Sequence, residues 1–260
     1  MANAAFVLDN MALSGNVAAS SQVLTMPVSK LLTPHPSERW RSLSDVDYFV
    51  LDNGGSITAD TVMIGGLTCS EDATVRLRLS SIDATGVAGD VLDTGVVANG
   101  DPGFDVDYRS FVAVLDVPLD WRYLRFDISD AGADYVEAGF VLEGLREEMA
   151  VNFAQGGSVQ YVDRSRVSKS SSGLSLVWQD NQFRRVDLSF PWVEESQRYG
   201  LIERLDRVCG RRSNVLLITE PDAANLPRVS FYGLMTDVTP VTFGIIFDLY
   251  GKQLRMEERI

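Results

Sequence analysis

Tyr123-Leu124-Arg125-Phe126-Asp127-Ile128 is the stretch of this 260-residue chain that decides its fold. Leu, Phe and Ile alternate with Tyr, Arg and Asp, which is the period-two pattern of a β-strand with one face on a core and one in water. The same alternation recurs at Val75, Leu77 and Leu79, and helical periodicity is scarce along the chain. The sequence therefore predicts a mainly β protein.

The composition is that of an ordinary globular protein, with 45% hydrophobic and 23% charged residues. A chain of this length is sufficient for two domains. Cys69 and Cys209 lie far apart in the sequence, so no disulfide framework is implied and a reducing cytoplasm suits the chain. No apolar run approaches the ~18 residues of a membrane span, and we expect no membrane insertion.

Negative charge is concentrated in the first half. Residues 1–150 hold 9 Lys and Arg against 23 Asp and Glu, whereas residues 151–260 hold 14 against 13. An acidic surface repels phosphate backbones, so we expect no nucleic-acid partner for the first half. The nearly neutral second half can pack against copies of itself.

We place a domain boundary near residue 150, where flexible Gly-rich and Ser-rich segments begin. The predicted domains are residues 1–149, a jelly-roll β-sandwich, and residues 150–260, a β-sheet or sandwich domain with one packed helix. In the second domain, Val186, Leu188, Phe190 and Trp192 are expected on one face of a strand. A helix is predicted at about 194–209, ending before Gly210. Further strands are expected at 215–218, 229–235, 241–250 and 254–257.

The sequence carries no recognisable catalytic motif. Its only histidine, His35, lies between two prolines in an expected loop, and no nucleophile elbow accompanies it. One His and two distant Cys give none of the zinc spacings. The acidic segment Asp101–Asp107 is the candidate for a calcium ion, but it lacks the terminal Glu of an EF-hand loop. We therefore expect no enzyme activity, no cofactor and no metal site.

Residues ~10–148 resemble discoidin-type, galactose-binding-like jelly rolls. The resemblance rests on an ordered set of features: Val17–Ser21, Pro27–Leu32, Arg39–Ser42, Tyr48–Gly54 and the strand Tyr123–Ile128. Ser29 and Asn53 depart from the family pattern. The resemblance implies a binding module with a β-sandwich fold.

Trp40 follows the proline-containing loop and precedes a strand, so its ring is expected to be partly exposed. With Arg39 and His35 it is the candidate ligand contact, and a host surface glycan is the candidate ligand.

Residues ~150–260 resemble the ring-forming domains of tailed-bacteriophage distal tail proteins. The resemblance rests on Ser172-Gly173, Arg185–Phe190, the helix ending at Gly210, Val215–Ile218 and Phe231–Leu234. It implies a homo-oligomeric ring that contacts other tail proteins, namely tube, hub and fibres. The sandwich-first order of the two domains is the reverse of the commonest arrangement in that family.

The leading hypothesis is a structural protein of a phage tail tip or baseplate, made in the host cytoplasm and located in the virion tail. Candidate residues of the assembly interface are Ile246, Tyr250, Arg211 and Arg212. The alternatives are a free carbohydrate-binding, lectin-like protein and a glycosidase, although no acid–base pair of carboxylates can be singled out for the glycosidase.

Overall fold

The computed structural model describes residues 2–244 and 248–259. Strands make up 49% of the chain and helices 11%, which confirms the predicted mainly β fold. The chain divides into two units, Met1–Glu148 with Val215–Ser230, and Met149–Asn214 with Phe231–Ile260. Residues 215–230 therefore lie with the first unit, although the sequence analysis assigned them to the second domain. Independent folding of residues 1–149 and 150–260 stays a prediction.

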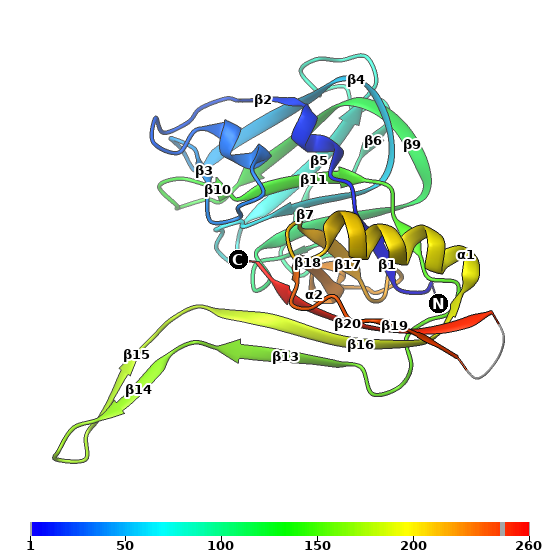
Figure 1. The fold of residues 1–260 in the computed structure, drawn as a ribbon. Coiled ribbons are helices and arrows are strands. Elements are labelled where there is room, and N and C mark those ends of the chain that lie inside the picture. Colours follow the sequence, from blue (N-terminus) through cyan, green and yellow to red (C-terminus); the bar gives the residue numbers. More distant parts are fainter. Residues whose placement is uncertain (1, 245–247, 260) are drawn as a thin grey trace. The chain divides into compact units, whose positions relative to one another are not determined.

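The first unit is a jelly-roll β-sandwich built on two strands of 20 residues, β4 (Val46–Gly65) and β9 (Ser110–Ser129). The two strands pair antiparallel over their whole length, with register shifts after Asp52 and after Ala59. Both strands curve from one layer of the sandwich into the other (Figure 1). The two layers therefore share their central strands.

Shorter strands complete each layer. The half of β4 that begins at Val46 lies beside β2 (Asn16–Ala19), and the paired half of β9 lies beside β5 (Thr74–Ser80). The other halves lie beside β11 (Phe140–Gly144) and β8 (Phe104–Asp105). The remaining elements of this unit are β1 (Ala5–Val7), η1 (Met11–Ser14), η2 (Val28–Leu32), β3 (Trp40–Arg41), β6 (Leu92–Asp93), β7 (Val97–Ala98), β10 (Glu137–Ala138), β12 (Glu147–Glu148), β17 (Val215–Ile218) and α2 (Leu226–Val229).

Aromatic rings fill the space between the layers. The Phe126 ring lies 5.8 Å from Phe49 and 5.3 Å from Phe111, measured between ring centroids. Leu77 and Leu124 are fully buried beside them, as the alternation in the sequence predicts. Each such side chain contributes about 1.5–3 kcal/mol of burial free energy, so this cluster is the main source of stability for the sandwich.

The second unit is a sheet around the long strand β16 (Gln182–Glu194), which pairs with β13 (Ser158–Asp163) and β20 (Leu249–Glu258). Strands β18 (Ser230–Met235) and β19 (Val241–Phe243) also pair with β20. The expected single strand over 241–250 is wrong, because β19 and β20 form an antiparallel pair. The two ends of this alternating segment therefore belong to different, antiparallel strands, and residues 245–247 lie outside the described residues.

The predicted helix at 194–209 is confirmed. It runs through α1 (Glu195–Gln197), η3 (Arg198–Ile202) and η4 (Leu205–Cys209) with wide, π-type turns. It ends at Gly210, whose φ of +49° favours glycine and whose N–H donates to the Leu205 carbonyl over 2.8 Å. Lys252 on β20 donates to both carboxylate oxygens of Asp206 at 2.8 Å, which fixes the helix to the sheet.

Trp192 is the exception to the predicted strand pattern. Val186, Leu188 and Phe190 are buried as expected, but Trp192 is exposed and Val193 is buried in its place. The pairing of β16 with β20 shifts register between Phe190 and Val193, so a β-bulge reverses the faces of the strand there. The expectation that Trp192 lies on the buried face is therefore wrong.

A buried carboxyl group lies where the long strands bend. Glu143 on β11 is fully buried and accepts hydrogen bonds from Trp121 Nε1 at 2.6 Å and from Asn53 Nδ2 at 2.9 Å. Burial raises the pKa of Glu143 from 4.5 to about 7, because the hydrogen bonds offset only part of the desolvation of its charged form. The folded protein therefore holds this proton across a pH range in which the unfolded chain releases it.

This difference predicts a pH-dependent stability. Between pH 4.5 and about 7 the unfolded state binds fewer protons at Glu143, so the free energy of unfolding should fall as pH rises through this window. Glu143→Gln should remove about 3 kcal/mol of that decrease. Urea unfolding of both proteins at pH 5 and pH 8 measures it, with the exposed Glu71→Gln as control. Equal pH profiles for the natural protein and Glu143→Gln would contradict the prediction.

Candidate functional site

The predicted ligand residues follow η2 in the first unit, and Trp40 is not at the surface. Its side chain is fully buried, its Nε1 donates to the Ser21 carbonyl at 3.0 Å, and its ring meets Phe49 edge-on at 5.8 Å. The expected partial exposure of Trp40 is wrong. The ring is part of the sandwich core and offers no face to a ligand.

Arg39 belongs to an ion cluster around Glu137, a buried residue on β10. Arg39 Nη1 donates to Thr68 at 2.7 Å and lies 3.4 Å from the Glu137 carboxylate, and Arg41 Nε donates to the same carboxylate at 2.6 Å. The Arg41 guanidinium also lies 3.9 Å from the centroid of the Tyr135 ring. These bonds join β3 to β10, so the cluster holds the loops at this end of the sandwich together.

His35 is exposed in the loop before β3, as expected for a residue between two prolines. Its position and that of Arg39 agree with a ligand contact at this end of the sandwich, which stays a prediction. Sequence reasoning missed Arg41, Tyr135 and Glu137 as neighbours of Arg39, because β10 is almost 100 residues away in the chain.

A second candidate site lies on the solvent face of the β4–β9–β5 layer. A groove of about 430 Å³ is lined there by apolar, aromatic and charged side chains, which include Val46, Tyr48, Arg76, Val96, Arg125 and Asp127. We name it the outer-face groove. Tyr48 lies opposite Asp127, and Asp127 lies opposite Arg76, so one row of side chains crosses all three strands.

Asp127 is fixed in the outer-face groove by two arginines. Arg125 donates to its Oδ1 at 3.0 and 2.8 Å, and Arg78 donates to its Oδ2 at 2.7 Å. The Arg125 guanidinium lies 3.4 Å from the centroid of the Tyr48 ring, which is cation–π geometry. The neighbouring Arg76 forms a two-bond pair with Asp93 at 2.8 and 2.5 Å. The Arg76 bond lowers the pKa of Asp93 to about 2, so this pair stays charged at neutral pH.

The loop between β5 and β6 holds these arginines in place. The Val87 carbonyl accepts a bond from Arg78, and the Thr85 carbonyl accepts one from Arg125. Gly86 has a φ of +68°, and a Cβ there would lie 2.5 Å from the Arg125 Cβ, so only glycine fits. Hydrogen bonds from the Ser80 and Ser81 hydroxyls lower the pKa of Asp90 to about 2. The groove is therefore built on side chains that are held in one geometry.

The candidate assembly residues Tyr250, Arg211 and Arg212 belong to the second unit. Tyr250 is buried, with the Phe243 ring 5.8 Å away and the Arg198 guanidinium 4.1 Å from its centroid. Its assignment to an interface is therefore corrected, because its own unit covers the ring. Arg211 and Arg212 are exposed after the helix, and Arg212 donates to the Arg207 and Val208 carbonyls. Ile246 lies outside the described residues.

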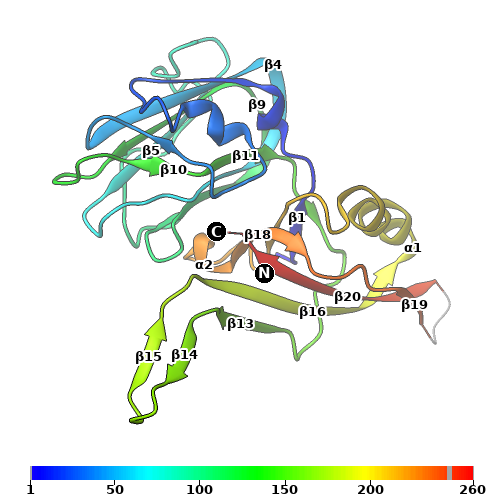
Figure 2. The ribbon, with the colours of Figure 1, turned by 60° about the vertical axis from the view of Figure 1, so that its left-hand side comes forward.

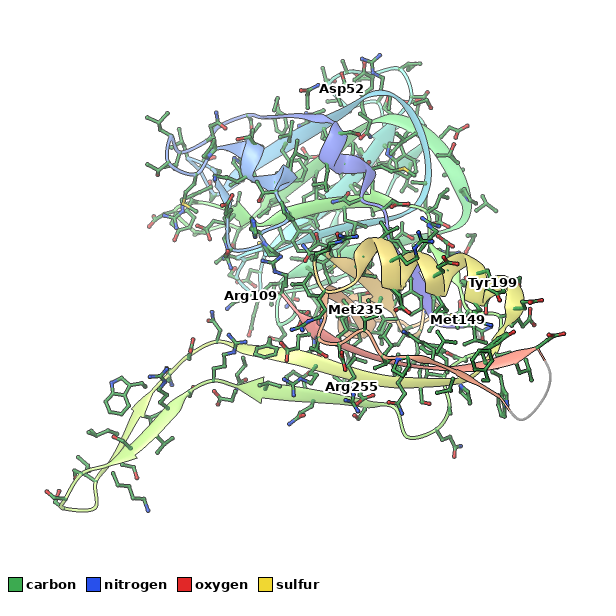
Figure 3. All side chains as sticks on the ribbon, viewed as in Figure 1. Asp52, Arg109, Met149, Tyr199, Met235 and Arg255 are labelled. Carbon is green, nitrogen blue, oxygen red and sulfur yellow. The ribbon has the colours of Figure 1, made fainter. Side chains whose placement is uncertain are left out.

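The feature that sequence reasoning missed is a protruding hairpin. Beyond β13 and β16, the strands β14 (Arg166–Lys169) and β15 (Ser175–Trp178) pair with each other in a separate two-stranded ribbon (Figure 2). We name residues 164–181 the arm. Every residue of β14 and β15 is exposed, and Figure 3 shows side chains standing out on both sides of the ribbon.

Apolar side chains are frequent on the arm. Leu174, Leu176 and Trp178 are spaced two apart, so they share one face, and they are 64%, 43% and 57% exposed. Val167 and Val177 lie opposite each other on the other face and are also exposed. Alternating apolar residues at 174, 176 and 178 were the sequence signal for this surface.

Two carboxylates of the acidic segment Asp101–Asp107 accept hydrogen bonds within the fold. Asp101 accepts the Ala98 N–H at 2.9 Å, and Asp105 accepts the Asp107 N–H at 2.9 Å and Asn225 Nδ2 at 2.6 Å. Within residues 2–244 and 248–259, no three side chains of His, Cys, Asp or Glu gather so that they could hold a metal ion.

None of the helices in this part of the chain has the length and apolar character to span a membrane.

No protein-family model matches this sequence, and no curated protein matches it either. Among solved structures, the chain is similar to chitosan-binding module 1 of a chitosanase/glucanase from Paenibacillus sp., at 15% identity and a TM-score of 0.40 over 52% of this chain and 98% of that one. It is also similar to the family 32 carbohydrate-binding module of C. perfringens NanJ, solved with galactose, at 12% identity and a TM-score of 0.41 over 55% and 99%. A Streptococcus pneumoniae fucose-binding module gives 10% identity and a TM-score of 0.40 over 52% and 97%.

The bonds within the acidic segment predict that chelation leaves stability unchanged. Because Asp101 and Asp105 already accept hydrogen bonds from protein donors, removal of calcium with EDTA should shift the melting temperature by less than about 2 °C. Thermal unfolding in EDTA and in added calcium measures this. A decrease of many degrees in EDTA that calcium restores would show a metal site.

Proposed function

We propose that this protein is a structural component of a phage tail tip or baseplate. Copies assemble into a ring through residues 151–260, next to tube, hub or fibre proteins of the tail. The first unit presents its β-sandwich outward to host glycans or neighbouring tail proteins. The chain is made in the host cytoplasm and resides in the virion tail. The tail setting rests on the resemblance of residues 150–260 to distal tail proteins, and the arm is the observation that carries the assembly.

The arm needs a partner for physical reasons. An isolated two-stranded ribbon is marginally stable in water, because neither face is covered. Exposed apolar clusters on soluble proteins mark interaction surfaces, and the row of Leu174, Leu176 and Trp178 is such a cluster. Trp is also the residue that most often dominates binding energy at protein interfaces. An interface that covers this row would therefore stabilise both the arm and the complex.

The open edge of β13 provides a second surface for assembly. Among the described strands, β13 pairs with β16 alone, so its other edge carries backbone N–H and C=O groups that a further strand could pair with. Edge strands of this kind add strands from other chains through backbone hydrogen bonds. The arm and this edge belong to one continuous hairpin.

Charge favours a second copy of this chain as the partner of the second unit. The first unit holds 10 Lys and Arg against 25 Asp and Glu, and the second holds 13 against 11. Faces of two first units would repel each other, whereas two second units carry both signs and little net charge. A head-to-tail contact between second units repeats around a closed ring when the rotation closes.

The second candidate function is a free carbohydrate-binding protein, which the outer-face groove favours. Such a protein would bind glycans as a monomer, whereas the tail-tip proposal requires assembly. The mass of the purified protein in solution therefore distinguishes the two candidates.

The test of assembly is a comparison of arm variants by native mass spectrometry and light scattering at equal concentration. The natural protein should form a closed oligomer. Leu176→Ser with Trp178→Ser should weaken association at least about tenfold, because two exposed apolar anchors are removed without change to a buried residue. Leu24→Ser with Ile82→Ser is the matched control, since both residues are highly exposed on the first unit.

Two results would count against the proposal. A natural protein that stays monomeric at every concentration would refute assembly and leave the carbohydrate-binding alternative. An arm variant that assembles as well as the control would show that the arm is not the interface. Near-ultraviolet circular dichroism of each variant establishes that it is folded.

A further inference from the structure

We propose that the outer-face groove binds a neutral pyranose, with its apolar ring face on Val46 and Val96 and its hydroxyls between Asp127 and Arg76. This inference deepens the proposed function, because it rests on the glycan contact assigned to the first unit. It places that contact on the sheet surface formed by β4, β5 and β9 and not on the loop that holds His35 and Arg39.

The polar groups of the groove match a pair of hydroxyls. Asp127 is oriented by Arg78 and Arg125, and its side chain remains 27% exposed, so its oxygens can accept further hydrogen bonds. Arg76 donates to Asp93 through Nε and Nη2, which leaves its Nη1 without a partner among the described residues. Its side chain is 38% exposed. A carboxylate acceptor and a guanidinium donor therefore lie on adjacent strands, in register, at one opening.

The apolar part of the groove matches the C–H face of a sugar ring. Val46 and Val96 are 59% and 68% exposed, which is a large exposure for valine on the surface of a sandwich. Tyr48 lies in the same groove, with the Arg125 guanidinium on its ring. A pocket with mostly apolar walls and a few fixed polar groups is the usual form of a small-molecule site.

The charge of the first unit argues for a neutral ligand. Three of the ten cationic side chains of this unit line the groove, but Arg78 and Arg125 are bonded to Asp127, and Arg76 is bonded to Asp93. Asp47 also lines the groove, so the three arginines are matched by Asp47, Asp93 and Asp127. No net positive charge remains for an anion, and the surrounding unit is strongly acidic. An acidic sugar would be repelled as it approaches, whereas a neutral one would not.

The geometry is set before any ligand arrives. Arg78 is nearly buried, and both its Nη atoms are bonded, to the Val87 carbonyl and to Asp127. Arg125 is held between Thr85, Tyr48 and Asp127 in the same way. Little side-chain entropy is therefore lost at Asp127 on binding, which favours affinity.

The test uses the full chain and four probes: the methyl glycosides of galactose, glucose and mannose, and glucuronic acid. Saturation-transfer NMR and calorimetry at millimolar concentrations should detect binding of at least one neutral glycoside and weaker or no binding of glucuronic acid. Val46→Glu and Arg76→Gln should each weaken binding of that glycoside, which means a dissociation constant at least about tenfold higher. Both residues are partly exposed, so the fold should tolerate the changes.

Matched controls separate the groove from the general surface. Val117→Glu changes an equally exposed valine, 60% against 59% for Val46. Arg122→Gln removes a cation with 39% exposure and an aspartate partner, like Arg76. Both controls should bind the glycoside as the natural protein does.

The result that overturns this inference differs from the one that overturns assembly. The absence of binding by every neutral glycoside, tighter binding of glucuronic acid, or equal binding by the groove variants and their controls would each refute it. Oligomer mass is measured on the same samples. A protein that assembles but binds no neutral sugar refutes the ligand alone, and a monomer that binds one refutes the assembly alone.

Discussion

The continuous pairing of β4 with β9 is the constraint on which the first unit depends. Each strand belongs to both layers, so the register that the two strands adopt decides which residues face the core on both sides of the bend. A slip of one residue in the first layer would turn Phe49 and Phe126 to solvent and bring Tyr48 and Asp127 inside. The core and the outer-face groove are therefore two consequences of one register, because side chains alternate across the same strands.

The bend that the long strands need is also where the sandwich holds buried polar atoms. Trp121 and Glu143 are fully buried there, and Asn53 Oδ1 has no hydrogen-bond partner among the described residues. A buried polar atom without a partner costs about 1–3 kcal/mol. The apolar cluster of Phe49, Phe126 and its neighbours offsets this cost. Irregular pairing at the bend is thus retained because the two layers could not otherwise share continuous strands.

Sequence reasoning succeeded where side chains alternate without interruption. It found the strands around 75–79 and 124–128 and the buried face of each, because burial of one face imposes a period of two. It failed where the backbone departs from that period. Trp192 follows a bulge, and the apolar alternation over 241–250 begins in β19 and ends in β20, two antiparallel strands that alternation cannot tell apart.

The candidate sites show the same limit for a different reason. The pattern Arg-Phe-Asp at 125–127 predicted that one face of this strand is exposed to solvent, and the outer-face groove lies on that face. The partners that make it a groove, Tyr48 and Arg76, come from strands whose neighbours depend on sheet order, which one sequence does not specify. Trp40 was assigned to the surface from its place after a loop, but only the packing against Phe49 decides its burial.

Binding and assembly make opposite demands on a surface, and under the proposed function this chain would meet them with different units. A surface that packs against copies of itself needs little net charge and exposed apolar anchors, and the second unit has both, in its nearly balanced charges and in the arm. A surface that must stay open to a ligand in a crowded assembly benefits from repulsion between copies. The acidic first unit would provide that repulsion, while the three arginines of its groove are matched by Asp47, Asp93 and Asp127. Under the proposed function, the uneven charge along the sequence would keep the groove free while the arm is covered.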